Sequence, residues 1–151
     1  MSDVKQKKSV LIVDDESTNI IALTKILKPD YTVRTAINGL DALRTAEKHL
    51  PDIILLDVVM PDMDGYTVLK KLKSSELMRG IPVIIITALS HELQEEKGLA
   101  LGAADYITKP FSPSIVKLRV MNQLMMYDML RAVEYDIMNY RLAIESMNIA
   151  Q

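Results

Sequence analysis

The chain has 151 residues, of which 49% are hydrophobic and 25% charged, and its formal net charge is −2. This composition is typical of a soluble globular protein, and a chain of this length favours one domain with an appendage. Because there is no cysteine, disulfides, thiolate metal sites and cysteine nucleophiles are excluded.

The N-terminal residues 1–8 are polar and charged, and the apolar run that follows is too short for the core of a signal peptide. No stretch approaches the roughly 20 apolar residues that cross a bilayer. The basic clusters at residues 7–8 and 71–73 are short, which is typical of a solvated surface and not of nucleic-acid contact. We therefore expect a cytoplasmic protein with no direct binding to membranes or nucleic acids.

Five segments have the character of strands. Three are continuous apolar runs rich in Val and Ile, at residues 10–13, 53–56 and 83–86. Such runs are typical of strands covered on both faces, as in a parallel sheet. Residues 31–36 alternate more, as an outer strand does, and residues 104–107 form a short fifth candidate.

Apolar residues at helical spacing lie between these strands. The three sets are Ile20, Leu23 and Leu27; Leu40, Leu43 and Ala46, before Pro51; and Val68, Leu69 and Leu72, after the turn at residues 61–65. Ser90 can cap a fourth helix, which Gly102 ends. Because crossovers between parallel strands are right-handed, the alternation predicts an α/β fold with a doubly wound, five-stranded parallel sheet of order 2-1-3-4-5, flavodoxin-like, with a long C-terminal helical extension.

Polar residues follow the strands at the edge where doubly wound sheets bind their ligands. Asp14 and Asp15 follow the first strand, Asp57 the third and Thr87 the fourth, and Lys109 lies just past the fifth. Carboxylates on neighbouring strands, about 4.8 Å apart, repel one another unless a cation such as Mg²⁺ binds them through oxygen. An amine and a hydroxyl suit a phosphoryl group, which a carboxylate can accept as an acyl phosphate. The pattern predicts Asp57 as nucleophile, with Thr87 and Lys109 as its catalytic partners.

Four motifs carry a family resemblance. They are VDD (residues 13–15), LLDVVMPDMDG (55–65), ITA (86–88) and DYITKPF (105–111). In this order and spacing they resemble the response-regulator receiver domain (CheY-like) of two-component signalling, over about residues 8 to 122. The resemblance implies a phosphorylation-activated switch and not an enzyme, with a sensor histidine kinase or a phosphotransfer protein as its partner.

The same resemblance implies roles for the site residues. Asp57 would be phosphorylated, and Mg²⁺ would be held by Asp57, Asp15, the backbone carbonyl of Val59 and, largely through water, Asp14. Thr87 and Lys109 would hold the phosphate, helped by the amide of residue 88.

The resemblance also implies a route for the signal. Tyr106 would be the switch aromatic, which swings inward when Thr87 moves toward the phosphate. The change would leave through the face formed by helix four, strand five and helix five. The Lys109–Pro110 peptide bond is expected to be cis.

Two other functions compete with the switch. A phosphatase of the haloacid-dehalogenase kind could use the same aspartate nucleophile, but it needs a second aspartate two residues later, where this chain has Val59. A module that uses the fold only as a scaffold for protein interaction is the third possibility. The intact set of Asp57, Thr87 and Lys109 argues against it.

Helical sequence continues from about residue 112 to the end, with no Gly or Pro after Pro113. We therefore divide the chain into a receiver domain over residues 1–122 and a helical extension over residues 123–151. Steps of three and four in the apolar stripe predict a nearly straight or locally unwound coiled coil. The stripe comprises Leu118, Met121, Met125, Met129, Val133, Ile137, Tyr140, Ile144 and Met147.

The extension has three possible roles. It could dimerise the protein as a coiled coil, fold back on its own domain as a helical hairpin, or link the domain to an output domain of a longer protein. We favour a homodimer through the C-terminal helix, with the chain as the N-terminal portion of a longer protein.

Overall fold

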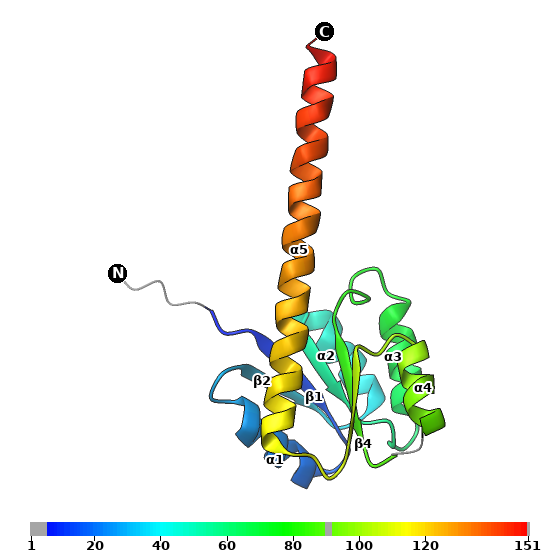
Figure 1. The fold of residues 1–151 in the computed structure, drawn as a ribbon. Helices are drawn as coiled ribbons and strands as arrows, with labels where there is room; N and C mark the ends of the chain where they lie inside the picture. Colours follow the sequence, from blue (N-terminus) through cyan, green and yellow to red (C-terminus); the bar gives the residue numbers. More distant parts are fainter. Residues whose placement is uncertain (1–5, 90–91, 151) are drawn as a thin grey trace.

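The computed structural model, which describes residues 6–89 and 92–150, contains a five-stranded parallel sheet with helices on both faces (Figure 1). The strands are β1 (Ser9–Val13), β2 (Thr32–Ala36), β3 (Ile53–Leu56), β4 (Val83–Thr87) and β5 (Asp105–Thr108), and the helices are α1 (Ser17–Leu27), α2 (Gly39–His49), α3 (Gly65–Lys73), α4 (Glu92–Ala100) and α5 (Pro113–Ile149). The strand order is β2-β1-β3-β4-β5, which confirms the predicted doubly wound topology.

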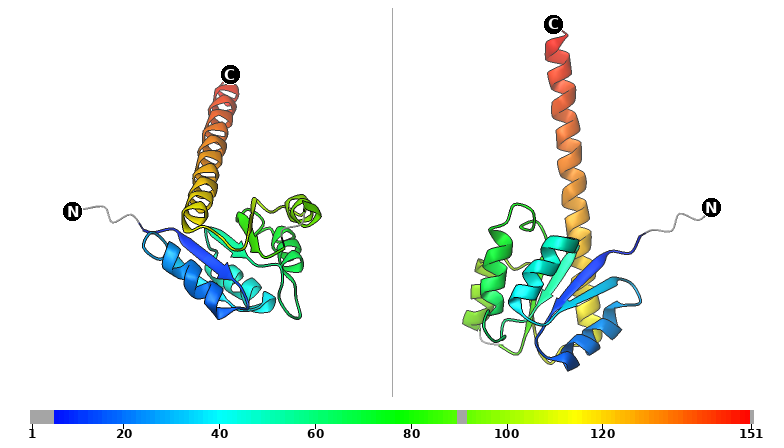
Figure 2. Two further views of the ribbon diagram at one scale, coloured as in Figure 1. Left: turned by 60° about the horizontal axis from the view of Figure 1, so that its bottom comes forward. Right: turned by 180° about the vertical axis from the view of Figure 1, so that it is seen from behind.

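The continuous apolar strands are explained by two cores, one on each face of the sheet. Leu11 and Leu56 belong to the core under α2 and α3, whereas Ile12 and Leu55 belong to the core under α1 and the start of α5. Figure 2 shows α2 and α5 on opposite sides of the sheet. Successive side chains alternate between faces, so a strand covered on both sides must be apolar throughout. The outer strand β2 is buried only at Ala36 and partly buried at Val33, as its more alternating sequence predicts.

Local signals set the ends of several helices. Asn38 caps α2 by accepting a hydrogen bond from the Asp41 N–H at 2.8 Å, and Asp64 caps α3 through the Thr67 N–H at 2.8 Å. Gly102, with φ +104°, follows the end of α4 as predicted, because glycine adopts this conformation without strain. The predicted cap Ser90 lies outside the described residues.

The prediction for the buried face of α2 is wrong in one residue. Leu40 is 52% exposed, and the buried residues of this helix are Gly39, Ala42 and Ala46. A Cβ on Gly39 would lie 2.7 Å from Sδ of Met63, so the helix approaches the loop before α3 too closely for a large side chain. The small residues therefore face inward and Leu40 faces solvent.

Helix α5 is one uninterrupted helix of 37 residues that leaves the domain, and it is about 56 Å long at about 1.5 Å per residue (Figure 1). Only its first turns pack on the domain, through Val116, Val120 and Leu124. The hairpin alternative is therefore wrong over the described part of the chain. Within residues 6–89 and 92–150, no helix has both the length and the apolar character needed to cross a bilayer.

Candidate functional site

The register of the sheet brings the predicted site residues to one edge. Val13 pairs with Leu56 across β1 and β3, so Asp14 and Asp57 follow neighbouring strands at the same level. The Asp57 N–H donates to the Val13 carbonyl at 2.9 Å, which continues the pairing past the end of the strands. On the other side, the Lys109 N–H donates to the Thr87 carbonyl at 2.8 Å. The short polar segments after the strands are thus held by backbone bonds.

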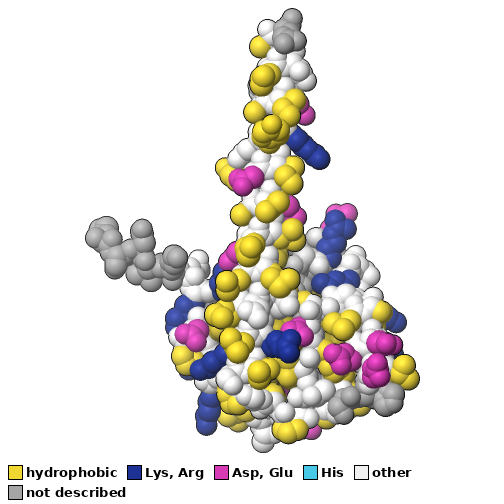
Figure 3. Space-filling view, in the orientation of Figure 1, with side chains coloured by type: hydrophobic (Ala, Val, Ile, Leu, Met, Phe, Trp, Pro, Cys, Tyr) yellow, Lys and Arg dark blue, Asp and Glu magenta, His cyan; other side chains and the backbone are white. Residues whose placement is uncertain are grey.

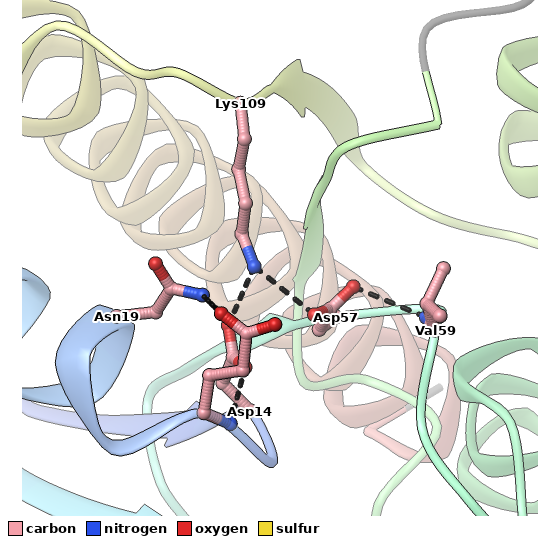
Figure 4. A network of polar contacts seen from close by, with 6 residues as sticks. Asp14, Asn19, Asp57, Val59 and Lys109 are labelled. Carbon is pink, nitrogen blue, oxygen red and sulfur yellow. Dashed lines mark hydrogen bonds and ion pairs between the residues drawn. The ribbon is translucent and has the colours of Figure 1, made fainter.

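Lys109 joins the two buried carboxylates (Figure 4). Its Nζ donates to Oδ2 of Asp14 at 2.7 Å and to Oδ2 of Asp57 at 3.0 Å. The other oxygen of each carboxylate accepts a backbone N–H, from Glu16 at 2.9 Å for Asp14 and from Val59 at 3.1 Å for Asp57. Each carboxylate is therefore oriented from two sides.

Burial and charge shift the proton affinities of this cluster. Burial raises the pKa of Asp14 above its usual value, and the hydrogen bond from Lys109 offsets this only in part. Burial alone would lower the pKa of Lys109, but its bonds to Asp14 and Asp57 outweigh burial and raise it. The amine therefore remains protonated at neutral pH, while negative charge at Asp14 is incompletely compensated.

The acidic residues fit a divalent cation. Asp14, Asp15 and Asp57 each offer a carboxylate oxygen, and these oxygens lie within 4.8 Å of one another. Three carboxylates face the single ammonium of Lys109, which leaves an excess of two negative charges when all are ionised. Oxygen ligands and this excess charge match the preferences of Mg²⁺. The N–H of Val59 donates to Oδ1 of Asp57. A metal-binding role for the Val59 carbonyl stays a prediction.

A close backbone approach shapes the loop between β3 and α3. The Gly65 N–H donates to the Val58 carbonyl at 2.9 Å. A Cβ on residue 65 would lie 2.3 Å from the carbonyl oxygen of Asp57 and 2.7 Å from Cα of Val58. Only glycine allows this approach, so Gly65 positions the backbone that carries Asp57.

Thr87 ends β4 at the edge that carries the site, and Tyr106 of β5 lies against Gly98 of α4. The hydroxyl of Thr87 is buried and has no hydrogen-bond partner among the residues that the structure describes. Tyr106 is 7% exposed, its hydroxyl donates to the Leu89 carbonyl, and burial raises its pKa to about 12. The side chain of Tyr106 thus lies inward, and the unsatisfied Thr87 hydroxyl could donate to a ligand oxygen. The Lys109–Pro110 bond is cis, as expected.

Tyr66 helps to hold α3 and α4 together beside the site, and the sequence analysis did not identify it. Its hydroxyl lies 3.0 Å from the carbonyl oxygen and 2.9 Å from Oε1 of Gln94, and the Lys97 ammonium lies 4.4 Å from the centre of its ring. Tyr66 therefore ties α3, which starts next to the Asp57 loop, to α4. It precedes Leu69 by three residues on the buried face, so helical spacing could have identified it.

Comparison with known proteins gives matches in sequence and in fold. Residues 10–121 match the model of the response regulator receiver domain family. The response regulator PleD of Caulobacter vibrioides is 46% identical over 112 residues, which make up 74% of this chain and 25% of PleD. The alkaline phosphatase synthesis transcriptional regulatory protein PhoP of Bacillus subtilis is 45% identical over 114 residues, or 75% of this chain and 47% of PhoP.

A solved structure matches over almost its whole length. The crystal structure of a CheY-like response regulator receiver domain protein from Methanospirillum hungatei superposes with a TM-score of 0.77 at 27% identity, covering 82% of this chain and 98% of that chain. The present chain spans less than half the length of the two curated relatives, PleD and PhoP.

Proposed function

The chain belongs to the response regulator receiver domain family, and on that premise we propose that it is a switch in which Asp57 accepts a phosphoryl group from a histidine kinase or a phosphotransfer protein. The observation that carries the proposal is the contact of Lys109 Nζ with carboxylates from two neighbouring strands, at 2.7 and 3.0 Å. An ammonium held beside a carboxylate nucleophile is placed to neutralise phosphoryl oxygens as the transfer proceeds.

The transfer exchanges one bond to phosphorus for another. An oxygen of Asp57 forms a bond to phosphorus, and the bond from phosphorus to the histidine nitrogen of the donor breaks, with its electron pair returning to the ring. Lys109 and the Thr87 hydroxyl donate to phosphoryl oxygens, and the N–H of Val59 keeps the Asp57 carboxylate oriented. Thr87 suits this role because its hydroxyl is buried and unpartnered within the described part of the chain.

We propose Mg²⁺ as the cofactor, held by Asp14, Asp15, Asp57 and the carbonyl of Val59. When bound, the ion neutralises charge on the phosphoryl group. The separation of the carboxylate oxygens, within 4.8 Å, supports this ligand set. No turnover of phosphate esters is proposed, because the position two residues after Asp57 carries no acid.

The signal would leave through α4, β5 and α5. Thr87 pairs with Thr108 of β5, and Tyr106 lies on the same strand. Arg119 of α5 contacts Asp105 of β5 at 3.1 Å, so a shift of this strand would reach the helix directly. We place the end of the receiver domain near residue 122, which the family match over residues 10–121 supports.

A small phosphodonor tests the proposal. The full chain is incubated with acetyl phosphate and Mg²⁺, and its intact mass is measured. We expect a gain of one phosphoryl group that needs Mg²⁺ and disappears in Asp57→Asn. Asp62→Asn is the matched control, because Asp62 is exposed with φ 67°, a conformation that asparagine tolerates. No gain in the unmodified chain, or an equal gain in Asp57→Asn, contradicts the proposal.

A further inference from the structure

The distal part of α5 has no cover from its own domain. Every described residue from 131 to 150 is exposed, and many of them are large and apolar. Hydrophobic side chains run along the projecting helix (Figure 3). A lone helix gains little stability in water without a packed face, and an exposed apolar surface of this extent marks an interaction site.

Six of the large apolar residues along α5 follow a strict seven-residue repeat, whereas others, such as Leu142, lie outside it. Starting at Leu130, successive steps are 3, 4, 3, 4 and 3, which define a seam of six residues. The seam comprises Leu130, Val133, Ile137, Tyr140, Ile144 and Met147, which are 45–72% exposed. A repeat of 3.5 residues is the pattern of a left-handed coiled coil, with Leu130, Ile137 and Ile144 at position a and the other three at position d. This regular repeat begins at Leu130, beyond Leu124, which is the last buried residue of the helix.

We propose that the seam binds a second copy of this chain, with the two α5 helices parallel and in register. The domain-facing residues Val116, Val120 and Leu124 lie about a third of a turn from the seam, so the domain does not occupy the partner's place. A hollow lies where the seam meets the domain and leaves room for an adjacent helix. Its lining includes Pro82, Gln123, Met126 and Leu130. Isoleucine, which two-stranded coiled coils favour at position a, occupies two of the three a positions, whereas the d positions carry Val, Tyr and Met in place of Leu.

The charges beside the seam are complementary between copies. Asp136 lies at position g and Arg141 at position e, five residues later. In a parallel pair in register, Asp136 faces the partner's Arg141, and the same contact repeats on the other side of the seam. A slip of one heptad would place Asp136 opposite either the partner's Glu134 or an uncharged asparagine. The charge pattern therefore supports zero stagger.

Sedimentation of the full chain without any phosphodonor tests the pairing. We expect a mass of twice the 17.0 kDa of one chain. Ile137→Lys, which puts a charge in the seam, is expected to give monomers. Leu142→Lys is the matched control, because Leu142 is 53% exposed but lies outside the seam, and this variant should remain a dimer. Far-UV circular dichroism checks that each variant keeps its folded domain.

Charge exchange tests the orientation. Asp136→Arg and Arg141→Asp should each weaken the dimer roughly tenfold, since each creates two like-charge contacts, and the double variant should regain affinity. In an antiparallel pair Arg141 would face the partner's Glu134, so Asp136→Arg would have little effect and the double variant would not recover. That result, a monomeric unmodified chain, or an assembly larger than two chains overturns the proposal. Asp57→Asn should dimerise normally, so failure of pairing is distinct from failure of phosphorylation.

Discussion

Replacing Lys109 with Met removes the ammonium that bridges two buried carboxylates. Lys109 Nζ lies 2.7 Å from Asp14 and 3.0 Å from Asp57, and the three side chains are 15%, 1% and 7% exposed, respectively. Methionine keeps an unbranched chain of similar length but carries no charge. Asp14 and Asp57 would then remain buried without the cation that contacts them.

The expected loss of stability is large for a single substitution. Removing one partner of a buried ion pair costs about 3–5 kcal/mol of the free energy of unfolding, because the remaining charge is uncompensated. For a chain of this size, that loss lowers Tm by roughly 6–20 °C. The exposed lysine Lys71 gives the control, and Lys71→Met should change the free energy of unfolding by less than about 0.5 kcal/mol.

The pH dependence of this loss follows from Asp14. Its pKa is already raised above 3.8 by burial, and loss of Lys109 raises it further. A carboxyl that holds its proton more tightly when folded makes folding less favourable as pH rises through the raised pKa. The deficit of Lys109→Met should therefore be greatest at neutral pH and shrink as pH falls toward 3.8, the ordinary value.

Urea unfolding followed by circular dichroism in EDTA, at neutral and at mildly acidic pH, measures both quantities. The double variant Lys109→Met with Asp14→Asn should recover part of the loss, since it removes one of the two uncompensated charges. A deficit below about 1 kcal/mol at neutral pH, or one that does not change with pH, would refute the role assigned to Lys109.

Three further substitutions probe the structure around Asp57. Gly65→Ala should lower the free energy of unfolding in urea by about 1–3 kcal/mol and slow phosphorylation of Asp57, because its Cβ would lie 2.3 Å from the Asp57 carbonyl oxygen. Gly80→Ala is the control and should have neither effect, since nothing lies within 4 Å of its Cβ. Equal behaviour of the two variants contradicts this prediction. Tyr66→Phe should cost about 1 kcal/mol and speed hydrogen exchange in α4; unchanged exchange there would show that the hydroxyl does not hold that helix. Burial raises the pKa of Tyr106 from 10.0 to about 12, so the free energy of unfolding of the unmodified protein should fall by up to roughly 3 kcal/mol relative to Tyr106→Phe as pH rises through this window. Parallel pH profiles of the two proteins would disprove the shift.

Several errors of prediction have a tertiary cause. Leu40 has the right spacing for a buried face of α2, but the buried face carries Gly39, Ala42 and Ala46, and Gly39 lies too close to Met63 for a larger side chain. Tyr66 acts through a hydroxyl that meets α4, and helical spacing alone does not show what lies opposite a side chain. The hairpin alternative for α5 was compatible with its composition and was decided by the uninterrupted helix.

The strand order, the edge that carries Asp14, Asp57, Thr87 and Lys109, and the length of the final helix could all be predicted from the amino-acid sequence. These follow from local periodicity, from the handedness of crossovers and from the absence of helix breakers, all of which act along the chain. Two features of the site could not be predicted in this way: one ammonium serves two carboxylates, and the Thr87 hydroxyl is buried without a partner in the described residues. Those features depend on distances between separate elements, which packing sets and which no pattern within a single element contains.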